Sequence, residues 1–600
     1  MLKRGIGLGL LCIAGHAYSA NITVNTVEDV DKADDQCSLR EAIIYVNKGM
    51  PEAGYNGCGG KDSTAIIELE SNKEYKLNSQ IQITQSVDIK SVYETTVVEI
   101  NPVQGKRNAT IKMVGKDRIF NIDRGLDTSE TAATGMLSVN LTEVTLSGCG
   151  QTNCATQGGL IYNKEYLTLN FGQLLNGYAT QGGALYNAGA YASNASLSGI
   201  VITNSLIQGN KASEGAAIYS EIPAYLVSRS LIRDNEVTSS GGAVFESKDQ
   251  FTEQALDNMG DAIARGILNS TLFNNKGYVV KVYDGMQVNN VTMLLNSMGL
   301  IVNAPFKKGF VANSIIAQNG SQDCTIQAGG EADQISNNLY SVGCQGTNST
   351  SLGNTRLIAG STTEGACDFS SDGILCPFAE SKTVALGYFL PRILPNYTKL
   401  SDSPIVNRGP LTAVRCSTED QRGKSRPSTN SELCDRGSIE LVLDTTTTTS
   451  VGSDITYGQT ASFSISDQLQ DGELVSAEEC KAIFKKDTDD NGNPWKTGCL
   501  KIVQTNTVSK GTMTINQAGD LVYTPNGNWH GSDEFKINVV TSTTRFNESG
   551  NPYISITGRV VQSPPNDFKS DKVKVSGGSL GVVSLFGLLG LVAYRRKKYN

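Results

Sequence analysis

The sequence predicts an all-β protein: a right-handed parallel β-helix with an N-terminal helical cap, then a β-sandwich and a short C-terminal transmembrane helix. Three observations support this fold class. A nine-residue pattern recurs through the middle of the chain, alternating strand-like segments follow a threonine-rich linker, and an uncharged apolar run precedes a basic C-terminus. The 62 glycines and the low charged fraction of 18% agree with short strands joined by tight turns.

The N-terminus has the pattern of a secretory signal peptide. Lys3 and Arg4 precede an apolar run, 6–14, and Ala17-Tyr18-Ser19-Ala20 is a cleavage site of the small-x-small type. We expect cleavage after Ala20. The expected organisation of the whole chain is a signal peptide (1–20), a β-helix with its cap (21–440), a linker (441–452), a β-sandwich (453–562), a stalk with a sorting motif (563–579) and a transmembrane helix with a basic tail (580–600).

A capping helix is predicted near the N-terminus of the β-helix, within residues 37–46. Ser38 and Glu41 have the spacing of a capping box, in which each side chain bonds a free backbone amide of the other residue. Leu39, Ile43 and Val46 would share one face of this helix. Such a helix would cover the first coil, whose open edge would otherwise pair with other chains.

The repeat is apolar, any, Asn, Ser or Val, any, apolar, two variable residues, Asn. Copies start at intervals of 25, 40, 21 and 23 residues, at Ile202, Val227, Ile267, Val288 and Val311, and a looser copy runs from Thr168 to Asn176. Arg229 replaces the first Asn of the second copy. A four-residue glycine element recurs at intervals of 24, 33 and 26; it begins at Gly158, Gly182, Gly215 and Gly241 and ends on an apolar residue, at Ile161, Leu185, Ile218 and Val244.

Two motifs that share a period near two dozen residues predict stacked coils rather than a sandwich. An Asn at the same corner of successive coils can join its amide to the next coil, and paired glycines allow a positive φ or a close backbone approach. The 40-residue interval predicts an excursion from one coil over Glu246 to Arg265. That excursion is either part of a binding face or a tolerated surface loop.

Cysteine use predicts an exported chain. Of the 13 cysteines, Cys12 leaves with the signal peptide, and an even set of 12 remains. Local loops suit a fold whose contacts are also local, so we expect neighbours to pair: Cys37–Cys58, Cys149–Cys154, Cys324–Cys344, Cys367–Cys376, Cys416–Cys434 and Cys480–Cys499.

Several motifs resemble a known family. Cys-Ser-Leu-Arg-Glu-Ala at 37–42 is similar to the CSLREA motif of exported bacterial β-helix proteins, and 403–409, 420–427 and 434–440 resemble the terminal module that follows such helices. With the C-terminal tail, the set resembles the rhombotarget A family. Arg408 and Arg436 depart from the small or apolar residues expected there. The resemblance implies no particular activity.

Composition predicts the linker, and the alternation of apolar and polar residues predicts the β-sandwich. Five threonines after Asp444 form the linker, and alternating segments at 511–515, 519–525 and 531–539 resemble Ig-like or cadherin-like repeats. Asp487, Asp489 and Asn491 have the spacing of the first half of a calcium loop, although Gly498 stands where the usual Glu is expected. The sequence suggests no other cofactor. The alternative to Ca²⁺ here is an ordinary polar turn.

The C-terminus reads as a sorting signal. Ser576, Gly577, Gly578 and Ser579 precede an apolar run, 580–594, which at 1.5 Å per residue spans only about 22 Å, and four basic residues follow. This tail resembles the GlyGly-CTERM signal that rhombosortase cleaves in Gram-negative bacteria. The resemblance implies cleavage near these glycines, brief residence in the inner membrane, and release to the cell surface, the outer membrane or the medium. A plain membrane anchor is the alternative.

Composition narrows the function classes. A net charge of −8 argues against a nucleic-acid partner, so we expect none. His530 is the one histidine left after export, which excludes a His-based triad in the large domain. We expect a surface or secreted protein that binds a glycan or envelope component without catalysis. The alternative is a polysaccharide lyase or glycoside hydrolase on the lateral face, with Arg229, Arg233 and Asp234 as candidate catalytic residues.

Overall fold

The computed structural model describes residues 20–565 with gaps at 94–103, 127–134, 151–153, 190–198, 223, 249–264, 307–308, 328–334, 343, 346–354, 357–372, 381–385, 395–396, 410–414, 427–432, 442–449, 466–473, 504–509, 517–518, 542–543 and 547–551. The predicted signal peptide, apart from Ala20, and the predicted sorting motif and transmembrane helix lie outside the described residues. Within them, no helix is long and apolar enough to cross a membrane.

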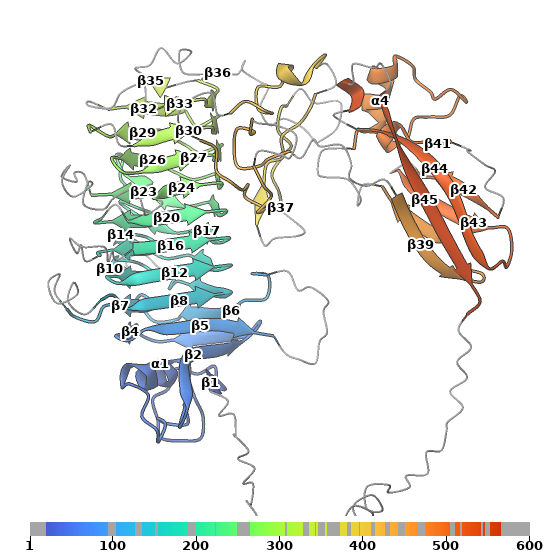
Figure 1. The fold of residues 1–600 in the computed structure, drawn as a ribbon. Coiled ribbons are helices and arrows are strands. Elements are labelled where there is room, and N and C mark those ends of the chain that lie inside the picture. The colour runs from blue at the N-terminus through green and yellow to red at the C-terminus, as the bar shows by residue number, and fades with distance from the viewer. Residues whose placement is uncertain are drawn as a thin grey trace, which may run out of the picture.

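The described part of the β-helix consists of stacked coils, whose strands line up into three long parallel sheets (Figure 1). The first sheet contains β1 (Ala20–Thr23), β2 (Ser63–Glu70), β5 (Val87–Val92), β8 (Ser138–Thr142), β12 (Tyr166–Asn170), β16 (Gly199–Thr203), β20 (Tyr225–Ser228), β24 (Gly266–Leu268), β27 (Gln287–Asn289), β30 (Phe310–Ala312) and β33 (Ile335–Ser336). The second sheet contains β3 (Glu74–Leu77), β6 (Ala109–Met113), β9 (Val144–Ser147), β13 (Gln173–Leu175), β17 (Leu206–Gln208), β21 (Leu231–Arg233), β25 (Thr271–Phe273), β28 (Thr292–Leu294), β31 (Ile315–Ala317), β34 (Leu339–Tyr340) and β36 (Thr355–Arg356).

The third sheet completes each coil. It contains β4 (Ile81–Ile83), β7 (Phe120–Ile122), β11 (Ile161–Asn163), β15 (Leu185–Asn187), β19 (Ile218–Ser220), β23 (Ala243–Ser247), β26 (Tyr278–Tyr283), β29 (Leu300–Asn303), β32 (Cys324–Ile326) and β35 (Cys344–Gln345). Two short parallel pairs lie between the second and third sheets along the chain, β10 (Ala155–Gln157) with β14 (Ala179–Gln181) and β18 (Lys211–Ala212) with β22 (Glu236–Val237). The prediction of a parallel β-solenoid is confirmed.

Strand register confirms the predicted repeat. The five predicted start positions, Ile202, Val227, Ile267, Val288 and Val311, are successive partners across the first sheet. Each is fully buried, so the repeated apolar residue forms one column of the core. A single buried cluster runs from Ile22 to Tyr340.

Two predicted copies are wrong by one residue. Leu169, not Thr168, pairs with Ile202, and Phe245, not Val244, pairs with Ile218. A one-residue slip exchanges the two faces of a strand, and Leu169 is the residue that is buried. At the second place the sequence could not decide, since Val244 and Phe245 are both buried.

The first Asn of the repeat lies at the corner between the first and second sheets. This position has a left-handed backbone, for which Asn is suited because its short polar side chain tolerates positive φ. The φ angles are 50° at Asn204, 46° at Asn269, 52° at Asn290 and 51° at Asn313. Arg229, which replaces the Asn in one copy, keeps the same conformation with φ of 50°.

The second Asn forms the predicted ladder. Side-chain amides donate from coil to coil at 2.9, 3.0, 2.9 and 2.8 Å through Asn210, Asn235, Asn275, Asn296 and Asn319. All five residues are buried. Each amide therefore satisfies the next in a place that water does not reach, which ties consecutive coils at one corner.

The N-terminal cap is also as predicted. Helix α1 (Leu39–Asn47) begins at Ser38, whose hydroxyl accepts from the Glu41 amide while the Glu41 carboxylate accepts from the Ser38 amide. Leu39, Ile43 and Val46 are buried and belong to the core cluster of the coils. The helix thereby extends the apolar column past the first coil.

A terminal module follows the coils. Its described elements are β37 (Ala379–Glu380), antiparallel to β38 (Gly387–Tyr388), and a 3-10 turn η2 (Leu400–Asp402). Its core includes Phe389, Ile405, Val406 and Leu441 together with Leu294 and Ile315 of the solenoid. The predicted linker thus starts at a residue, Leu441, that packs in this module, and residues 442–449 lie outside the described residues.

The last unit is a β-sandwich. One sheet contains β39 (Ser450–Thr456), β45 (Tyr553–Ser563), β44 (Gly531–Val540) and β41 (Lys501–Val503), and the other contains β40 (Ala461–Ser464), β43 (Asp520–Pro525) and β42 (Gly511–Ile515). The three predicted strands correspond to β42, β43 and β44. Helix α4 (Ala477–Phe484) and the turns η3 (Thr497–Cys499) and η4 (Thr544–Phe546), which the sequence did not suggest, complete the unit.

Four disulfides join predicted pairs, namely Cys37–Cys58, Cys149–Cys154, Cys416–Cys434 and Cys480–Cys499. Cys324 and Cys376 are also disulfide-bonded. The predicted excursion begins later than expected, because Glu246 is still part of β23, and 249–264 lie outside the described residues.

Candidate functional site

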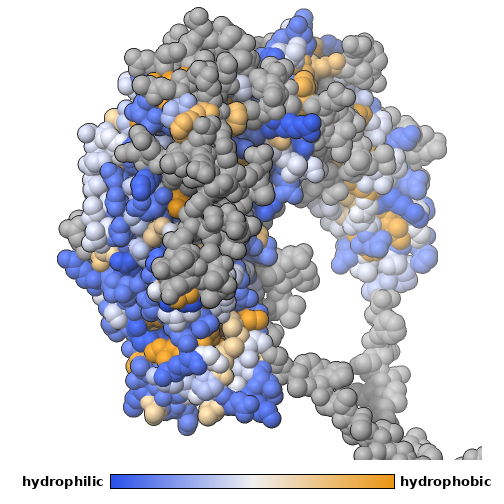
Figure 2. Space-filling model, turned by 60° about the vertical axis from the view of Figure 1, so that its left-hand side comes forward, coloured by the Kyte–Doolittle hydropathy of each residue, from blue (hydrophilic) through white to orange (hydrophobic). Residues whose placement is uncertain are grey.

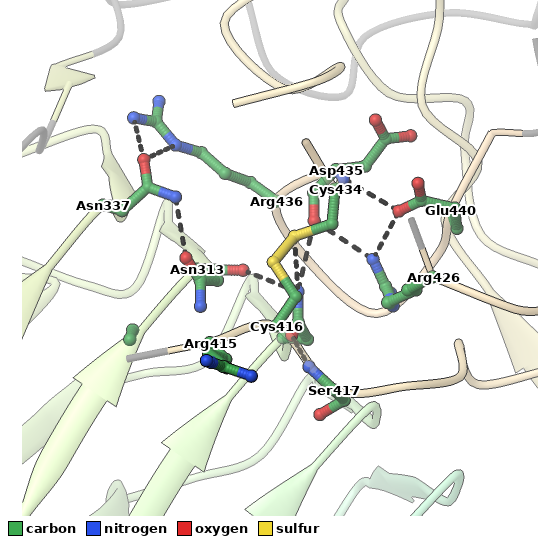
Figure 3. Close-up of a disulfide and its surroundings, with 12 residues drawn as sticks. Asn313, Asn337, Arg415, Cys416, Ser417, Arg426, Cys434, Asp435, Arg436 and Glu440 are labelled. Carbon is green, nitrogen blue, oxygen red and sulfur yellow. Dashed lines mark hydrogen bonds and ion pairs between the residues drawn. A yellow bond between two sulfur atoms is a disulfide. The ribbon is translucent and has the colours of Figure 1, made fainter. Parts of the chain in front are cut away.

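The terminal module is held together by a buried network of charges (Figure 3). Arg426 donates to the Glu440 carboxylate at 2.9 Å, and both side chains are fully buried. Asp435 accepts from the backbone amides of Asn407 and Leu441, each at 2.7 Å. Burial raises the pKa of Asp435, and the nearby Glu440 charge raises it further. Such a network fixes one arrangement of the chain, because each buried charge lacks water and needs its partners.

The same module docks on the coils. Arg436 donates to Asn337 at 2.8 and 3.2 Å, and Asn337 donates to Asn313 at 2.7 Å, so the corner asparagines continue into the module (Figure 3). Thr271 of the second sheet donates to Gln421 at 2.6 Å. Burial and the charge of Arg408 lower the pKa of Arg436 to about 10. Of the two arginines at the unexpected positions, Arg436 thus serves docking, whereas Arg408 bonds the carbonyl of Ser403 within the module.

The three candidate catalytic residues lie beside this docked module. Arg229, at the corner between the first and second sheets, forms an ion pair with Glu419 of the module. Arg233 bonds Asp234 at 2.7 Å and lies over the rings of Phe273 and Phe378, 5.6 and 5.2 Å from their centroids.

Asp234 accepts further bonds from Gln208 at 2.9 Å and from Asn274 at 2.6 Å. Arg229 and Arg233 stand at opposite ends of β21 and each has its own structural partner. The three residues therefore have roles in docking and coil contact, and the structure does not direct them toward a common reacting centre.

The outer face of the third sheet carries a tyrosine ladder. The rings of Tyr162, Tyr186 and Tyr219 stack with centroids 5.7 and 5.3 Å apart, and Arg118 covers the outer ring at 5.3 Å from its centroid. Tyr186 donates to Glu221. Because the middle ring is covered on both faces and Tyr162 is covered by Arg118, these two rings stabilise the sheet rather than offering flat aromatic surface.

Glu246 of β23 is a deeply buried acid that lies next to a cation. It forms an ion pair with Lys281 and accepts from the Ala243 amide at 2.9 Å. Burial raises the pKa of Glu246, and Glu214 contributes in the same direction. Among the described residues no cluster of three or more acidic, Cys or His side chains is arranged to hold a metal ion.

The predicted calcium ligands lie on a hairpin of the sandwich. Asp489 accepts from the amides of Asn491 and Asn493, both at 2.8 Å, and a bridge between Thr488 and Pro494 closes the hairpin. One Asp489 oxygen therefore serves the turn itself. The polar-turn interpretation accounts for these contacts of Asp489.

A hollow of about 330 Å³ opens beside this hairpin, on the sandwich. Its polar part consists of the hairpin residues and two lysines, and its apolar part comes from β41, β42, β45 and the segment before η3. The lining residues are Asp489, Asp490, Asn491, Asn493, Pro494, Trp495, Lys496, Leu500, Lys501, Ile502, Ile515 and Tyr553.

The aromatic residues of the hollow are fixed in place. Phe484 of α4 lies between Trp495 and Tyr553, with ring centroids 4.9 and 5.6 Å away. The Trp495 indole donates to the Lys486 carbonyl at 2.8 Å. Burial raises the pKa of Tyr553, and the charges of Asp490 and Asp489 raise it further.

The acid at the rim is paired. Asp490 accepts from Lys501 at 3.1 Å and from Lys486 at 3.4 Å, and these lysines lower the pKa of Asp490. Sequence reasoning singled out Asp489 and Asn491 but missed Trp495, Tyr553 and the lysines. The available signal was a Trp four residues after Asn491, inside the loop closed by Cys480–Cys499.

Comparison with known protein families gives a match for the β-sandwich. Residues 442–550 match the model of a bacterial Ig domain. The match ends before β45, which completes the four-stranded sheet. No curated protein and no solved structure matches the chain.

The Ig domain and the disulfides together indicate an exported bacterial protein of the surface or secreted class. The visible face of the described residues is mainly hydrophilic, with hydrophobic residues in small separate groups (Figure 2). Such a surface suits a protein that meets water along its length.

Proposed function

We propose that this chain is a non-catalytic binding protein of the bacterial surface. The coils form a rigid column, and the Ig domain presents the binding site. The observation that carries the proposal is the hollow on the Ig domain, where Trp495 and Tyr553 meet the polar hairpin residues Asp489 and Asn491. Pockets that combine aromatic walls with a few placed polar groups are the usual form of a small-ligand site.

The contacts of the three catalytic candidates favour binding over a lyase. A lyase would need a base free to take a proton from the substrate. Arg229 is paired with Glu419, and Arg233 is held between Asp234 and two phenylalanine rings. Freeing either side chain would disturb the docking of the terminal module.

We further propose that rhombosortase cleaves the chain near Gly577 to Ser579 after insertion of residues 580–594 in the inner membrane. The basis is the sequence pattern of the tail. Mass spectrometry of the exported protein tests this directly. A C-terminus near these residues supports processing, and an intact end at Asn600 contradicts it.

The binding function is tested with the exported chain applied to whole cells and to purified envelope fractions. Retention on either supports the proposal. In parallel, the chain is incubated with pectin, alginate and glycosaminoglycans in the presence of Ca²⁺, and unsaturated products are followed by ultraviolet absorbance. Product formation that depends on Arg233 would replace the binding function with lyase chemistry.

A further inference from the structure

The hollow on the Ig domain has two chemically distinct walls. One wall is apolar and includes Trp495, Tyr553 and Leu500, and the opposite rim is polar and includes Asp490 and Asn493. A ligand that fits both needs one apolar face and several hydroxyl groups around its edge. A pyranose ring has this form, since its axial C–H groups pack on aromatic surface and its hydroxyls bond carboxylates and amides.

The size of the hollow agrees with a small ring compound. About 330 Å³ lies near the lower end of the range of roughly 300–1,000 Å³ for ligand pockets. A long apolar chain would leave the polar rim without partners, which costs free energy.

The walls are held before any ligand binds. The indole of Trp495 is fixed by its bond to the Lys486 carbonyl and by stacking on Phe484. The disulfide Cys480–Cys499 closes the segment that carries the hairpin. A site with fixed walls loses little conformational entropy when a ligand binds, which favours binding.

The charges of the hollow indicate which sugars it takes. Asp489 and Asp490 are balanced by Lys496 and Lys501, and Asp490 is already paired with Lys501 at 3.1 Å. A uronate or sulfated sugar would meet two carboxylates and would have to displace a lysine from its partner. A neutral hexose adds hydrogen bonds without disturbing that pair.

We propose that this hollow binds one hexopyranose residue of a neutral glycan. The inference rests on the proposed binding function and names its ligand. The Asp490 carboxylate and the exposed side chain of Asn493 would bond the hydroxyls, and the partly exposed ring of Tyr553, beside the buried Trp495, would pack on the C–H face.

The chain itself provides a reporter. Its two tryptophans are Trp495 and Trp529, and Trp529 bonds the Lys510 carbonyl and does not line the hollow. In a Trp529→Phe background the full exported chain is titrated with glucose, galactose, mannose, N-acetylglucosamine and glucuronate while Trp495 fluorescence is followed. We expect a saturable change with at least one neutral hexose, and at least about tenfold weaker binding of glucuronate.

Variants separate this site from general effects on folding. Asp490→Ala and Tyr553→Ala should each weaken hexose binding about tenfold, and Tyr553→Phe, which keeps the ring, should weaken it less than Tyr553→Ala. Asp454→Ala is the matched control, because Asp454 is an exposed acid on β39 away from the hollow. Far-UV circular dichroism and thermal midpoints check that each variant is folded.

The outcomes distinguish the inference from the proposed function. No saturable response to any neutral hexose, a response to Ca²⁺ alone, equal binding of glucuronate, or parent-like binding by both alanine variants would overturn the inference. If the chain still adheres to cells while any of these holds, the binding function stands and its ligand site lies elsewhere. If the chain adheres to no cell or envelope preparation, the proposed function fails as well.

Discussion

Replacing Asn275 with alanine tests the amide ladder that joins the coils. The Asn275 carbonyl accepts from the backbone amide and the side chain of Asn235, both at 3.0 Å, and its amide donates to Asn296 at 2.9 Å. It also donates to the carbonyls of Ile232 and Phe273 at 3.1 and 3.2 Å. Asn275→Ala removes all five bonds and leaves the Asn235 backbone amide without this acceptor in the core.

The magnitude follows from the buried groups. One orphaned buried donor costs about 1–3 kcal/mol, and each remaining bond is worth about 1 kcal/mol or less because several carbonyls keep other partners. We expect Asn275→Ala to lower the free energy of unfolding by about 3–5 kcal/mol. Asn274→Ala is the matched control, because Asn274 directly precedes Asn275 but is exposed and donates one bond to Asp234. That variant should cost about 1 kcal/mol.

Urea unfolding followed by far-UV circular dichroism measures both variants. Tryptophan fluorescence serves as an internal reference, because both tryptophans lie in the Ig domain and report on its unfolding. The midpoint of the Ig domain should stay constant while the solenoid transition shifts. If Asn275→Ala costs no more than Asn274→Ala, the ladder does not stabilise the coils and the reasoning is refuted.

Three further perturbations have defined outcomes. Ser38→Ala removes the helix cap and should lower the free energy of unfolding by about 1 kcal/mol in thermal melts, whereas Ser38→Thr should retain most of it; equal effects would contradict the cap. Arg426→Met leaves Glu440 buried without its partner and should cost about 3–5 kcal/mol, seen as faster proteolysis of the terminal module, and adding Glu440→Leu should restore much of it. Burial and the bond to Glu221 raise the pKa of Tyr186, so above pH about 10 the unfolded chain releases a proton that the folded chain keeps, and stability falls as pH rises. In Tyr186→Phe the urea midpoint should therefore fall less with rising pH between pH 9 and 11 than it does in the parent chain. The same fall in both chains would contradict this role of Tyr186.

The coils were predictable because their residues report two separate constraints. An apolar residue and an Asn recur at a fixed spacing, so the intervals between copies gave the strand register directly, whereas the left-handed backbone at the first Asn was seen only in the structure. The capping box at Ser38 and Glu41 was predictable for the same reason, since both partners are close in sequence. Predictions failed where the pattern was ambiguous, as at Val244 and Phe245, which are both apolar and both buried.

The site was harder to predict because its residues come together only in the folded chain. Trp495 and Tyr553 are separated by more than fifty residues, and Phe484 between them lies on a helix that alternation did not reveal. The contacts of Arg229 follow from the return of the terminal module onto the coils, a contact across 190 positions. Local patterns contain no information about such pairings.

The stacked coils also have a consequence for how such a chain can change its reach. Every coil meets its neighbours through the same sheet register and, over much of the column, through the same asparagine contact. Among the coils that precede Arg229, before those that the terminal module contacts, inserting or deleting one whole turn of about two dozen residues would therefore re-create the junction it interrupts, and would move the two ends by about 5 Å. A protein of this kind can therefore change its length in steps of one coil, while the N-terminal helical cap and the Ig domain keep their sequences.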